Sequence, residues 1–400
     1  FRNVLLASVL GFVVLPAHSM DSEVVAYFPE WSADQHGYTV KSIVDSGSAE
    51  LITVLNYSFI IPGPNESGDV VCQLHDPVLA YQTTFANALS DPDDYDSIAG
   101  LDGHFGELRK FKIQYPHVRV LAAIGGWTGS TWFSDAAMTA QSRSTFVSSC
   151  ISLLLNGNLP GVIHDGWIGV FDGFDIDWEY PVTGGDSGVH HNSNDDVNLT
   201  ALLAEFRSQM NAWQAANGHP GLLLTIATPG SDFRGQNYQI NQDQEHVDWF
   251  NLMTYDFHGT WEKKTGHHTN LRQSPDDPSS DAFKLAIDNT IRLYRDTYGV
   301  KVDKLVPGGA FYGRGWKGVS SSNNGLYQGG RAATGLYEDG YNLWRDLEPL
   351  LDQGNDMHWD SHALASWLYS PSDGIFWTLD DPQSLALKTR YADAYGLRGV

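Results

Sequence analysis

Basic residues are scarce in this 400-residue sequence. It contains 24 Lys and Arg residues against 48 Asp and Glu residues, which gives a formal net charge of −24 at pH 7. A surface this negative repels phosphate backbones and anionic lipid headgroups. We therefore expect neither nucleic acid nor a membrane surface as a partner, and a neutral or cationic substrate is easier to accommodate. A role of the charge in solubility alone is equally consistent with these numbers.

Cysteine is almost absent, since Cys72 and Cys150 are the only two in the chain. A protein of this length can bury a large hydrophobic core, so we do not expect the fold to depend on disulfides. The two cysteines form a disulfide in one interpretation and are buried free thiols in the other. The sequence does not decide between them.

A long hydrophobic run is missing too. The apolar segment Val4–Leu15 follows a basic residue and is too short for a confident membrane span. Ala17 and Ser19 come next at the spacing of a cleavage site, which completes the pattern of a secretory signal peptide. We assign residues 1–19 to a partial signal peptide, because the chain begins with Phe1 rather than Met, and we expect a secreted, extracellular protein.

Eight short runs of strand-forming residues alternate with helical patterns along the rest of the chain. This alternation predicts an α/β fold with a parallel sheet, and eight strands favour a closed (β/α)8 TIM barrel over an open sheet. Four of the predicted helices end at a glycine, which readily adopts the left-handed conformation of a helix C-terminus. The strands are predicted to begin at Val24, Leu51, Val118, Phe171, Leu222, Trp249, Lys304 and Leu397, and the glycines are Gly157, Gly218, Gly299 and Gly396.

The last two predicted strands are separated by roughly eighty residues, far more than one crossover helix requires. Residues 312–378 lie in this gap, and the stretches GLYEDGYNLW and ASWLYSPSDGIFWTLD there predict a small α+β insertion domain between strands seven and eight. The barrel then comprises residues 20–311 and, after the insertion, the last helix and the start of strand eight at 379–400. Because Val400 falls inside an apolar run, we expect the chain to be truncated there.

Four carboxylates lie within the stretch FDGFDIDWEY, from Phe171 to Tyr180, among apolar residues typical of a buried strand. Alternate residues of a strand point to the same side. We therefore predict that Phe174, Ile176 and Trp178 face the helices, and that the barrel interior receives Gly173, Asp175, Asp177 and Glu179. Glu179 comes last, at the C-terminal rim where barrel enzymes place their chemistry. Asp172 has the opposite parity, and we predict a structural hydrogen-bonding role for it.

Three inward carboxylates cannot all ionise at low cost in a low-dielectric interior. We expect them to share protons, with at least one raised pKa, as a general acid requires. A satisfied structural network and a divalent-metal site are the alternatives, but nothing nearby on this strand completes a coordination shell. We therefore predict no metal and no cofactor. The doublets His190–His191 and His267–His268 are interpreted as solvated loop residues rather than metal ligands.

The stretch DGFDIDWEYP resembles the DxxDxDxE signature of the family 18 glycoside hydrolases, the retaining chitinases. Further motifs of that family occur along the chain, namely AYFPEW, LNYSFI, IGGW, MTYDFHGTW and FYGRGW. The region beginning YSPSDGIFW resembles the chitinase insertion domain followed by the last helix and strand. The resemblance covers Val24 to Val400. The chain departs from the family at Ala123, where Ser is usual, and it stops before the Trp that the eighth strand normally carries.

The resemblance implies a chitinase that hydrolyses β-1,4 bonds between N-acetylglucosamine units with retention of configuration. Glu179 would be the general acid and base, and the N-acetyl carbonyl of the substrate would form an oxazolinium ion. Asp177 would orient the acetamido group, Asp175 would share a proton with Asp177, and Tyr255 would hydrogen-bond the acetamido group. The resemblance also implies substrate-binding roles for Tyr27, Phe59, Trp127, Tyr180, Met253, Asp256, Trp261, Tyr312 and Arg314, and structural roles for Asp172 and Gly173.

Other readings of the same motif stay open. A non-catalytic chitin-binding lectin on the same fold would lack the acid, and Glu179 is present. An endo-β-N-acetylglucosaminidase shares the core motif, but a long insertion beside the cleft suits a long polymer, so we expect an endo-acting chitinase. Asp177 as a direct nucleophile is the alternative chemistry, although two carboxyl groups on one strand do not flank a bond from opposite faces.

The expected partners are chitin and N-acetylglucosamine oligosaccharides, and we expect a monomer.

Overall fold

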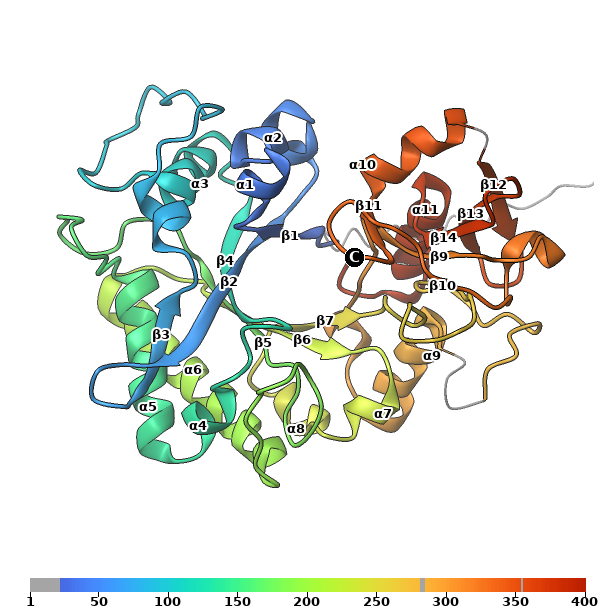
Figure 1. Cartoon of the computed structure of the whole chain (residues 1–400). Coiled ribbons are helices and arrows are strands. Elements are labelled where there is room, and N and C mark those ends of the chain that lie inside the picture. Colours follow the sequence, from blue (N-terminus) through green and yellow to red (C-terminus); the bar gives the residue numbers. More distant parts are fainter. Residues whose placement is uncertain (1–21, 281–284, 354) are drawn as a thin grey trace, which may run out of the picture.

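The computed structural model describes residues 22–280, 285–353 and 355–400. The expected signal peptide, residues 1–19, lies outside the described residues. The chain forms a curled parallel sheet with helices on its outer side and a separate antiparallel sheet (Figure 1). No helix of the described part has the length and apolar character needed to cross a bilayer.

The parallel sheet has the strand order β1-β2-β4-β5-β6-β7-β8, and each neighbouring pair runs in the same direction. One further strand, β3 (Val70–Leu74), pairs antiparallel with β2. The parallel strands correspond to seven of the eight predicted runs, so the prediction of an α/β fold with a parallel sheet is confirmed. Their bounds are Val25–Pro29 (β1), Val54–Pro64 (β2), Arg119–Gly125 (β4), Gly173–Asp177 (β5), Leu223–Pro229 (β6), Trp249–Met253 (β7) and Leu305–Pro307 (β8).

Residues 398–400, which belong to the eighth strand predicted to begin at Leu397, connect the two edges of this sheet. The amide of Arg398 donates to the carbonyl of Leu305 in β8 at 3.0 Å. The amide of Val400 donates to the carbonyl of Glu23 at 3.0 Å, and the carbonyl of Val400 accepts from the amide of Val25 in β1 at 2.9 Å. These residues form an isolated parallel bridge rather than a named strand. Backbone hydrogen bonds nevertheless lead from β8 through them to β1.

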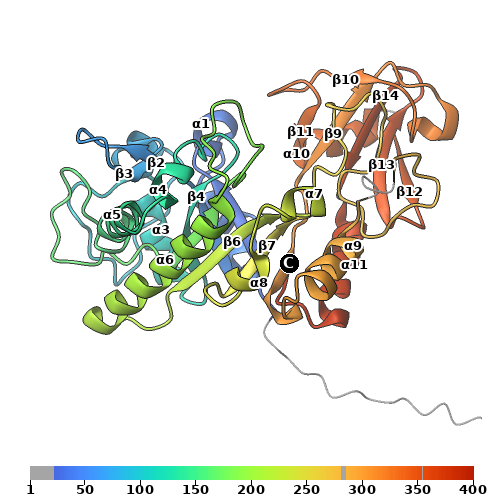
Figure 2. The same ribbon diagram turned by 90° about the horizontal axis from the view of Figure 1, so that it is seen from below.

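Helices cover the outer side of the parallel sheet (Figure 2). Two of the predicted helix ends are seen directly, because α6 (Asp195–Asn217) ends at Gly218 and α11 (Pro382–Tyr395) ends at Gly396. Both glycines are left-handed, with φ of 62° and 65°. Further α-helices are Ser32–His36 (α1), Val40–Asp45 (α2), Gly103–Gln114 (α3), Phe133–Ala137 (α4), Ala140–Cys150 (α5), Asp232–Gly235 (α7), Ile240–Asp243 (α8), Ile287–Arg292 (α9) and Trp344–Leu347 (α10).

The main core lies between the parallel sheet and its helices. Phe174 and Ile176 of β5 and Trp178, which directly follows this strand, belong to it and are fully buried, which confirms the predicted outward face. The ring of Phe174 lies 5.3 Å from that of Phe206 in α6. A smaller apolar cluster fills the sheet interior near the N-terminal ends of the strands, and its buried members are Val54, Leu121, Trp249 and Val306.

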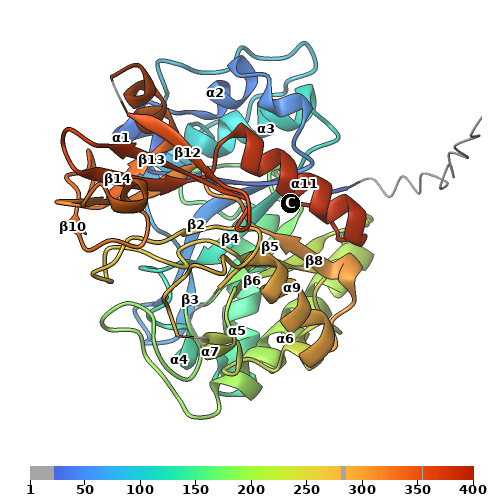
Figure 3. The ribbon, with the colours of Figure 1, turned by 90° about the vertical axis from the view of Figure 1, so that its right-hand side faces the viewer.

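The antiparallel sheet lies beside the parallel one and takes its strands from the chain between β8 and α11 (Figure 3). Its order is β10-β9-β14-β13-β12, and β11 also pairs with β9. This sheet occupies the region in which the sequence predicts an inserted α+β module, whose boundaries stay a prediction. The strands are Tyr312–Lys317 (β9), Arg331–Ala332 (β10), Tyr341–Leu343 (β11), Asp356–Asp360 (β12), Ala365–Ser370 (β13) and Ile375–Leu379 (β14).

A disulfide joins Cys72 of β3 to Cys150 at the end of α5. Of the two interpretations that the sequence leaves open, the structure therefore has the bonded one. Both residues are buried in the main core, and the bond spans a sequence separation of 78 residues. A cross-link over that many residues restricts the unfolded chain and thereby stabilises the folded one.

Replacing Cys72 and Cys150 by alanine is expected to lower the free energy of unfolding by about 2–5 kcal/mol, because the unfolded chain regains its freedom. Denaturant unfolding of both proteins, with and without a reductant, measures this. Reduced wild-type protein should approach the variant, whereas the variant should not respond to the reductant. Equal unfolding midpoints for the variant and the oxidised wild type would contradict a stabilising role of the bond.

Candidate active site

Asp175, Asp177 and Glu179 form a line of buried carboxylates at the C-terminal end of β5; we call these three residues the carboxylate line. Asp175 and Asp177 lie within the strand, and Glu179 follows it by two residues. Their exposed fractions rise along the line, from 0% for Asp175 to 5% for Asp177 and 8% for Glu179. Glu179 is therefore the member most accessible to a substrate.

Asp175 is held by hydrogen bonds from three other strands. The Tyr27 hydroxyl of β1 donates to Oδ2 at 2.7 Å, and the Asn251 amide of β7 donates to Oδ1 at 3.0 Å. The Thr225 hydroxyl of β6 also donates to Oδ1. Burial raises the pKa of Asp175, while these three donors act in the opposite direction because they stabilise the ionised form. Because β1 and β7 are not neighbours of β5, these contacts show that the side chain of Asp175 points into the interior of the curled sheet.

The carboxyl group of Asp177 differs from that of Asp175 in its hydrogen bonding. Its Oδ1 is buried and has no hydrogen-bond partner within the described part of the chain. Burial raises the pKa of Asp177 well above its ordinary value, and the neighbouring Glu179 and Asp175 raise it further. Asp177 therefore favours its protonated form, whereas the hydrogen bonds of Asp175 favour the ionised one.

Burial raises the pKa of Glu179 from an ordinary value of 4.5 to about 7. The hydroxyl of Tyr180 acts to lower this pKa, and the carboxylate of Asp256 acts to raise it. A carboxyl group with such a pKa is present in both forms near neutral pH. It can therefore donate a proton in one step and accept one in the next.

The loop after β4 fixes the backbone around Glu179. The Ser130 hydroxyl accepts from the amide of Glu179 at 2.8 Å and donates to the carbonyl of Gly126 at 2.8 Å. Gly125 of the IGGW stretch has φ of +110°, and a Cβ there would lie 2.2 Å from the carbonyl oxygen of Asp177. A side chain at this position would collide with the backbone of β5, so the close approach of the two strands requires glycine. Sequence reasoning did not single out Ser130, which belongs to no recognised motif.

Asp256 lies on the loop after β7, and Arg314 of β9 occupies its carboxylate. The guanidinium binds both oxygens, with Nε to Oδ1 and Nη2 to Oδ2 each at 2.8 Å. Burial alone would raise the pKa of Asp256, but the nearby imidazole of His268 and the bidentate guanidinium of Arg314 hold it well below its ordinary value. The guanidinium of Arg314 was expected to donate to sugar oxygens. It instead binds Asp256 and thereby links the antiparallel sheet to the site.

The predicted binding residues differ in exposure. Trp127 and Trp261 are 51% and 60% exposed and offer flat apolar faces to solvent. The rings of Trp127 and Tyr180 lie 6.5 Å apart, and those of Tyr312 and Tyr255 lie 6.2 Å apart. These contacts connect the binding candidates with residues next to the carboxylate line. The half-buried members of the predicted set are Phe59, Tyr180, Met253, Tyr255, Asp256, Tyr312 and Arg314, and Tyr27 is 37% exposed.

Asp172 and Gly173 have structural contacts at the start of β5. Asp172 accepts from the ammonium of Lys112 and from the amide of Val120, each at 2.9 Å. Gly173 has φ of +146°, and a Cβ there would lie 1.9 Å from the carbonyl oxygen of Leu223 in β6. Both residues therefore fix the entry of β5 into the sheet.

The interpretation of His267 and His268 as solvated loop residues is wrong. Their exposed fractions are 2% and 0%. His267 Nε2 lies 3.3 Å from Asp360 of β12, and His268 Nδ1 lies 3.7 Å from Asp256. The loop that carries them packs against the antiparallel sheet, a tertiary contact that the polar stretch TGHHTN does not reveal. His190 and His191 are exposed, as expected.

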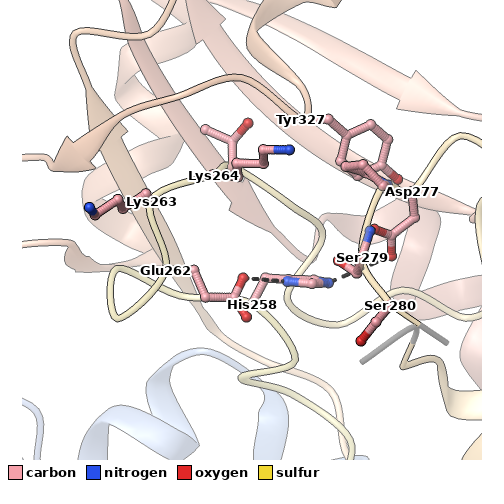
Figure 4. Close-up of a pocket in the computed structure, with 10 residues that line it drawn as sticks. His258, Glu262, Lys263, Lys264, Asp277, Ser279, Ser280 and Tyr327 are labelled. Carbon is pink, nitrogen blue, oxygen red and sulfur yellow. Dashed lines mark hydrogen bonds and ion pairs between the residues drawn. The ribbon is translucent and has the colours of Figure 1, made fainter. Parts of the chain in front are cut away.

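A pocket of about 250 Å³ lies beside the same loop and is lined by residues outside the carboxylate line (Figure 4). Its His258 lies between two carboxylates, with Nδ1 2.7 Å from Glu262 and Nε2 3.8 Å from Asp277. Glu262 directly follows the exposed Trp261, so these ion pairs hold the turn that carries this aromatic side chain. Within the described ranges, no group of three or more His, Cys, Asp or Glu side chains is arranged to hold a metal ion.

The ion pairs of His258 with Glu262 and Asp277 predict that the protein loses stability in alkaline solution. Burial acts to lower the pKa of His258, but Asp277 and Glu262 raise it to about 9, above the unfolded value of about 6.5. The resulting stabilisation is complete below about pH 6.5 and is lost as the pH rises through about 9. We expect the unfolding free energy of the wild type to fall by roughly 1–3 kcal/mol across this window, and that of His258→Gln to fall less. Chemical denaturation across the window measures both, and parallel curves would contradict the assignment.

Buried carboxylates at the C-terminal end of a parallel strand, one of them with a pKa near neutrality, are typical of a glycoside hydrolase. Residues 23–400 match the family described as Glycosyl hydrolases family 18. The chain belongs to this family, whose fold is the (β/α)8 barrel.

Several chitinases are similar to this chain. It is 33% identical to chitinase A1 of Niallia circulans over 429 residues, which cover 99% of the chain and 58% of that protein. It is 31% identical to chitinase C of Streptomyces lividans over 385 residues, which cover 94% of the chain and 56% of that protein. The chain thus spans just over half the length of these two relatives. The solved catalytic domain of the psychrophilic chitinase B from Arthrobacter TAD20 has a TM-score of 0.83 and 30% identity, covering 94% of this chain and 90% of that one.

Proposed function

We propose that this chain is a secreted, endo-acting chitinase that hydrolyses β-1,4 bonds between N-acetylglucosamine units with retention of configuration. The observation that carries the proposal is Glu179, a carboxyl group with a pKa of about 7 at the least buried end of the carboxylate line. Family membership and the similarity to chitinases support the substrate class. The net charge of −24 repels polyanions but tolerates a neutral polymer.

Glu179 would act as the acid in the first step. Its proton passes to the glycosidic oxygen, the bond from that oxygen to the anomeric carbon breaks, and the N-acetyl carbonyl oxygen of the same sugar bonds to that carbon. The product is an oxazolinium ion. Water then attacks the anomeric carbon and opens this ring while ionised Glu179 takes the proton of the water, so the two inversions give net retention. A pKa of about 7 suits both steps.

The carboxylates around Glu179 support a nucleophile that comes from the substrate. A protein nucleophile would have to face the acid across the bond, at about 5 Å. Asp177 is the last residue of β5 and precedes Glu179 by only two positions, and both oxygens of Asp256 are bound to Arg314. Neither aspartate is arranged as an opposing nucleophile.

Asp177 and Tyr255 would bind the acetamido group during this reaction. Asp177 Oδ1 has no partner among the described residues and can accept from the acetamido N–H. Burial and the neighbouring Asp177 and Glu179 raise the pKa of Tyr255 well above its ordinary value, so its hydroxyl stays a neutral donor. Met253, at the end of β7, would pack against the acetamido methyl.

The wider substrate site and the domain organisation belong to the same proposal. Trp127 and Trp261 would stack on the apolar faces of sugar rings, and further contacts would come from Tyr27, Phe59, Tyr180, Tyr312 and Arg314. The antiparallel sheet would be the chitinase insertion domain, at residues 312–378, and would form a wall beside the polymer. The barrel would comprise residues 20–311 and 379–400, after a signal peptide at 1–19. We propose a monomer that binds chitin and its oligosaccharides.

The Glu179→Gln variant tests the acid. We expect it to lower the turnover of chitooligosaccharides by about 10²-fold or more, because glutamine has no proton to transfer, while binding changes by less than about tenfold. Glu66→Gln, a matched change at an exposed loop residue, should leave both unchanged. Substantial residual turnover in Glu179→Gln contradicts the acid role. Binding without turnover by the wild type indicates the lectin instead, and a first product with inverted configuration excludes the retaining mechanism.

The pH dependence of kcat/KM follows from the same group. Because Glu179 must be protonated in the free enzyme, activity on an uncharged chitooligosaccharide should fall as the pH rises above about 7. Initial rates at subsaturating substrate give this profile. A rate that continues to rise above about pH 8 is incompatible with Glu179 as the acid.

A further inference from the structure

The hydrogen bonds of Asp175 come unevenly from the strands around it. In the sheet, Asp175 is in register with Ala123 of β4 on one side and with Thr225 of β6 on the other. Ala123 is fully buried and brings only a methyl group. Thr225 and Asn251 are also buried, at 0% and 7% exposed, and both donate to Oδ1. One side of Asp175 is therefore apolar, and the other side carries two donors.

Asn251 can act on Asp175 only as a donor. The indole N–H of Trp249 donates to Asn251 Oδ1 at 3.0 Å, and an indole nitrogen cannot accept. This contact fixes the orientation of the amide and directs its Nδ2 to Asp175 Oδ1 at 3.0 Å. Since Oδ1 also receives the Thr225 hydroxyl, this oxygen accepts two hydrogen bonds, and both favour the ionised carboxylate.

The groups that titrate around Asp175 add no positive charge. They are Tyr27 of β1, Asp177 of β5 itself and Tyr255 after β7, and each is neutral or anionic. The negative charge of Asp175 is therefore stabilised by hydrogen-bond donors. Asp177, whose Oδ1 has no donor in the described part of the chain, has no comparable stabilisation.

We propose that Thr225 and Asn251 are positioning residues that keep Asp175 ionised and thereby leave the proton shared by the two aspartates on Asp177. This inference rests on the proposed function, because it assigns the starting protonation state of the same reaction. With Asp177 neutral, no second negative charge stands next to Glu179 when the reaction begins. If the donors are removed, the proton moves to Asp175, Asp177 becomes anionic, and like-charge repulsion raises the pKa of Glu179.

The Thr225→Val variant tests this chain of effects, since valine keeps the shape and removes the donor. We expect kcat on chitooligosaccharides to fall about tenfold or more, KM to change less than about threefold, and the alkaline limb of the pH profile to move to higher pH. Asn251→Leu should act in the same direction. Thr225→Ser should retain the wild-type profile. Thr228→Val is the matched control, because it removes a buried hydroxyl from the outward face of the same strand.

A second substitution, on the apolar side of Asp175, distinguishes the loss of a hydrogen bond to Asp175 from a general loss of protein stability. Ala123→Ser places a hydroxyl in register with Asp175, so adding it to Thr225→Val should restore kcat and return the alkaline limb toward the wild-type position. A Thr225→Val enzyme with wild-type kcat and pH profile overturns the proposal. So does a loss of kcat that Thr228→Val reproduces with the pH profile unmoved.

A titration without turnover separates this inference from the proposed function. Carbon-13 NMR of labelled aspartate carboxyl groups, assigned with Asp175→Asn and Asp177→Asn, should show Asp175 ionised and Asp177 protonated at about pH 6 in the wild type. In Thr225→Val the proton should move to Asp175. This result stands even if the chain cleaves no chitooligosaccharide, whereas a protonated Asp175 in the wild type refutes the inference while leaving the function intact.

Discussion

Burial of three carboxylates along the end of β5 and the two residues after it is the constraint that shapes the rest of the site. A buried charge is costly unless donors or a proton compensate for it. The protein meets this cost differently at each position: Asp175 receives three neutral donors, Asp177 favours its proton, and Glu179 lies at the more exposed end with a pKa of about 7. The proposed protonation states would place an ionised Asp175, a neutral Asp177 and a titrating Glu179 in order toward solvent. Under the proposed function, this order would make the cluster suited to acid–base chemistry.

The strands beside β5 are adapted to this arrangement in two ways. β4 makes room, because Ala123 is small and Gly125 allows the backbone of β5 to approach closely. The strands β1, β6 and β7 supply the donors that hold Asp175. Below them, an apolar cluster fills the interior of the sheet. The polar upper half and the apolar lower half of the interior therefore have separate roles in chemistry and in stability.

Much of the fold and the centre of the site could be predicted from the sequence, because they follow from local periodicity. A strand has two faces, so the alternation in FDGFDIDWEY was sufficient to separate the core residues from the carboxylate line. The partners of Asp175 were not predictable, since Thr225, Asn251 and Tyr27 lie 50, 76 and 148 residues away and meet it only through the pairing and curling of the sheet. The burial of His267 and His268 escaped prediction for the same reason. It depends on packing between two sheets rather than on the polarity of neighbouring residues.

The bidentate contact between Arg314 and Asp256 joins a strand of the antiparallel sheet to a loop of the parallel one. Arg314 also lies 5.3 to 5.4 Å from the ring centroids of Trp261, Tyr312 and Tyr341, so one cation organises several aromatic faces. A displacement of one sheet against the other would separate two opposite charges in a poorly hydrated place and disturb those faces together. Because Asp256 also acts on the pKa of Glu179, the packing of the two sheets against each other and the electrostatics of the carboxylate line are linked through this one ion pair.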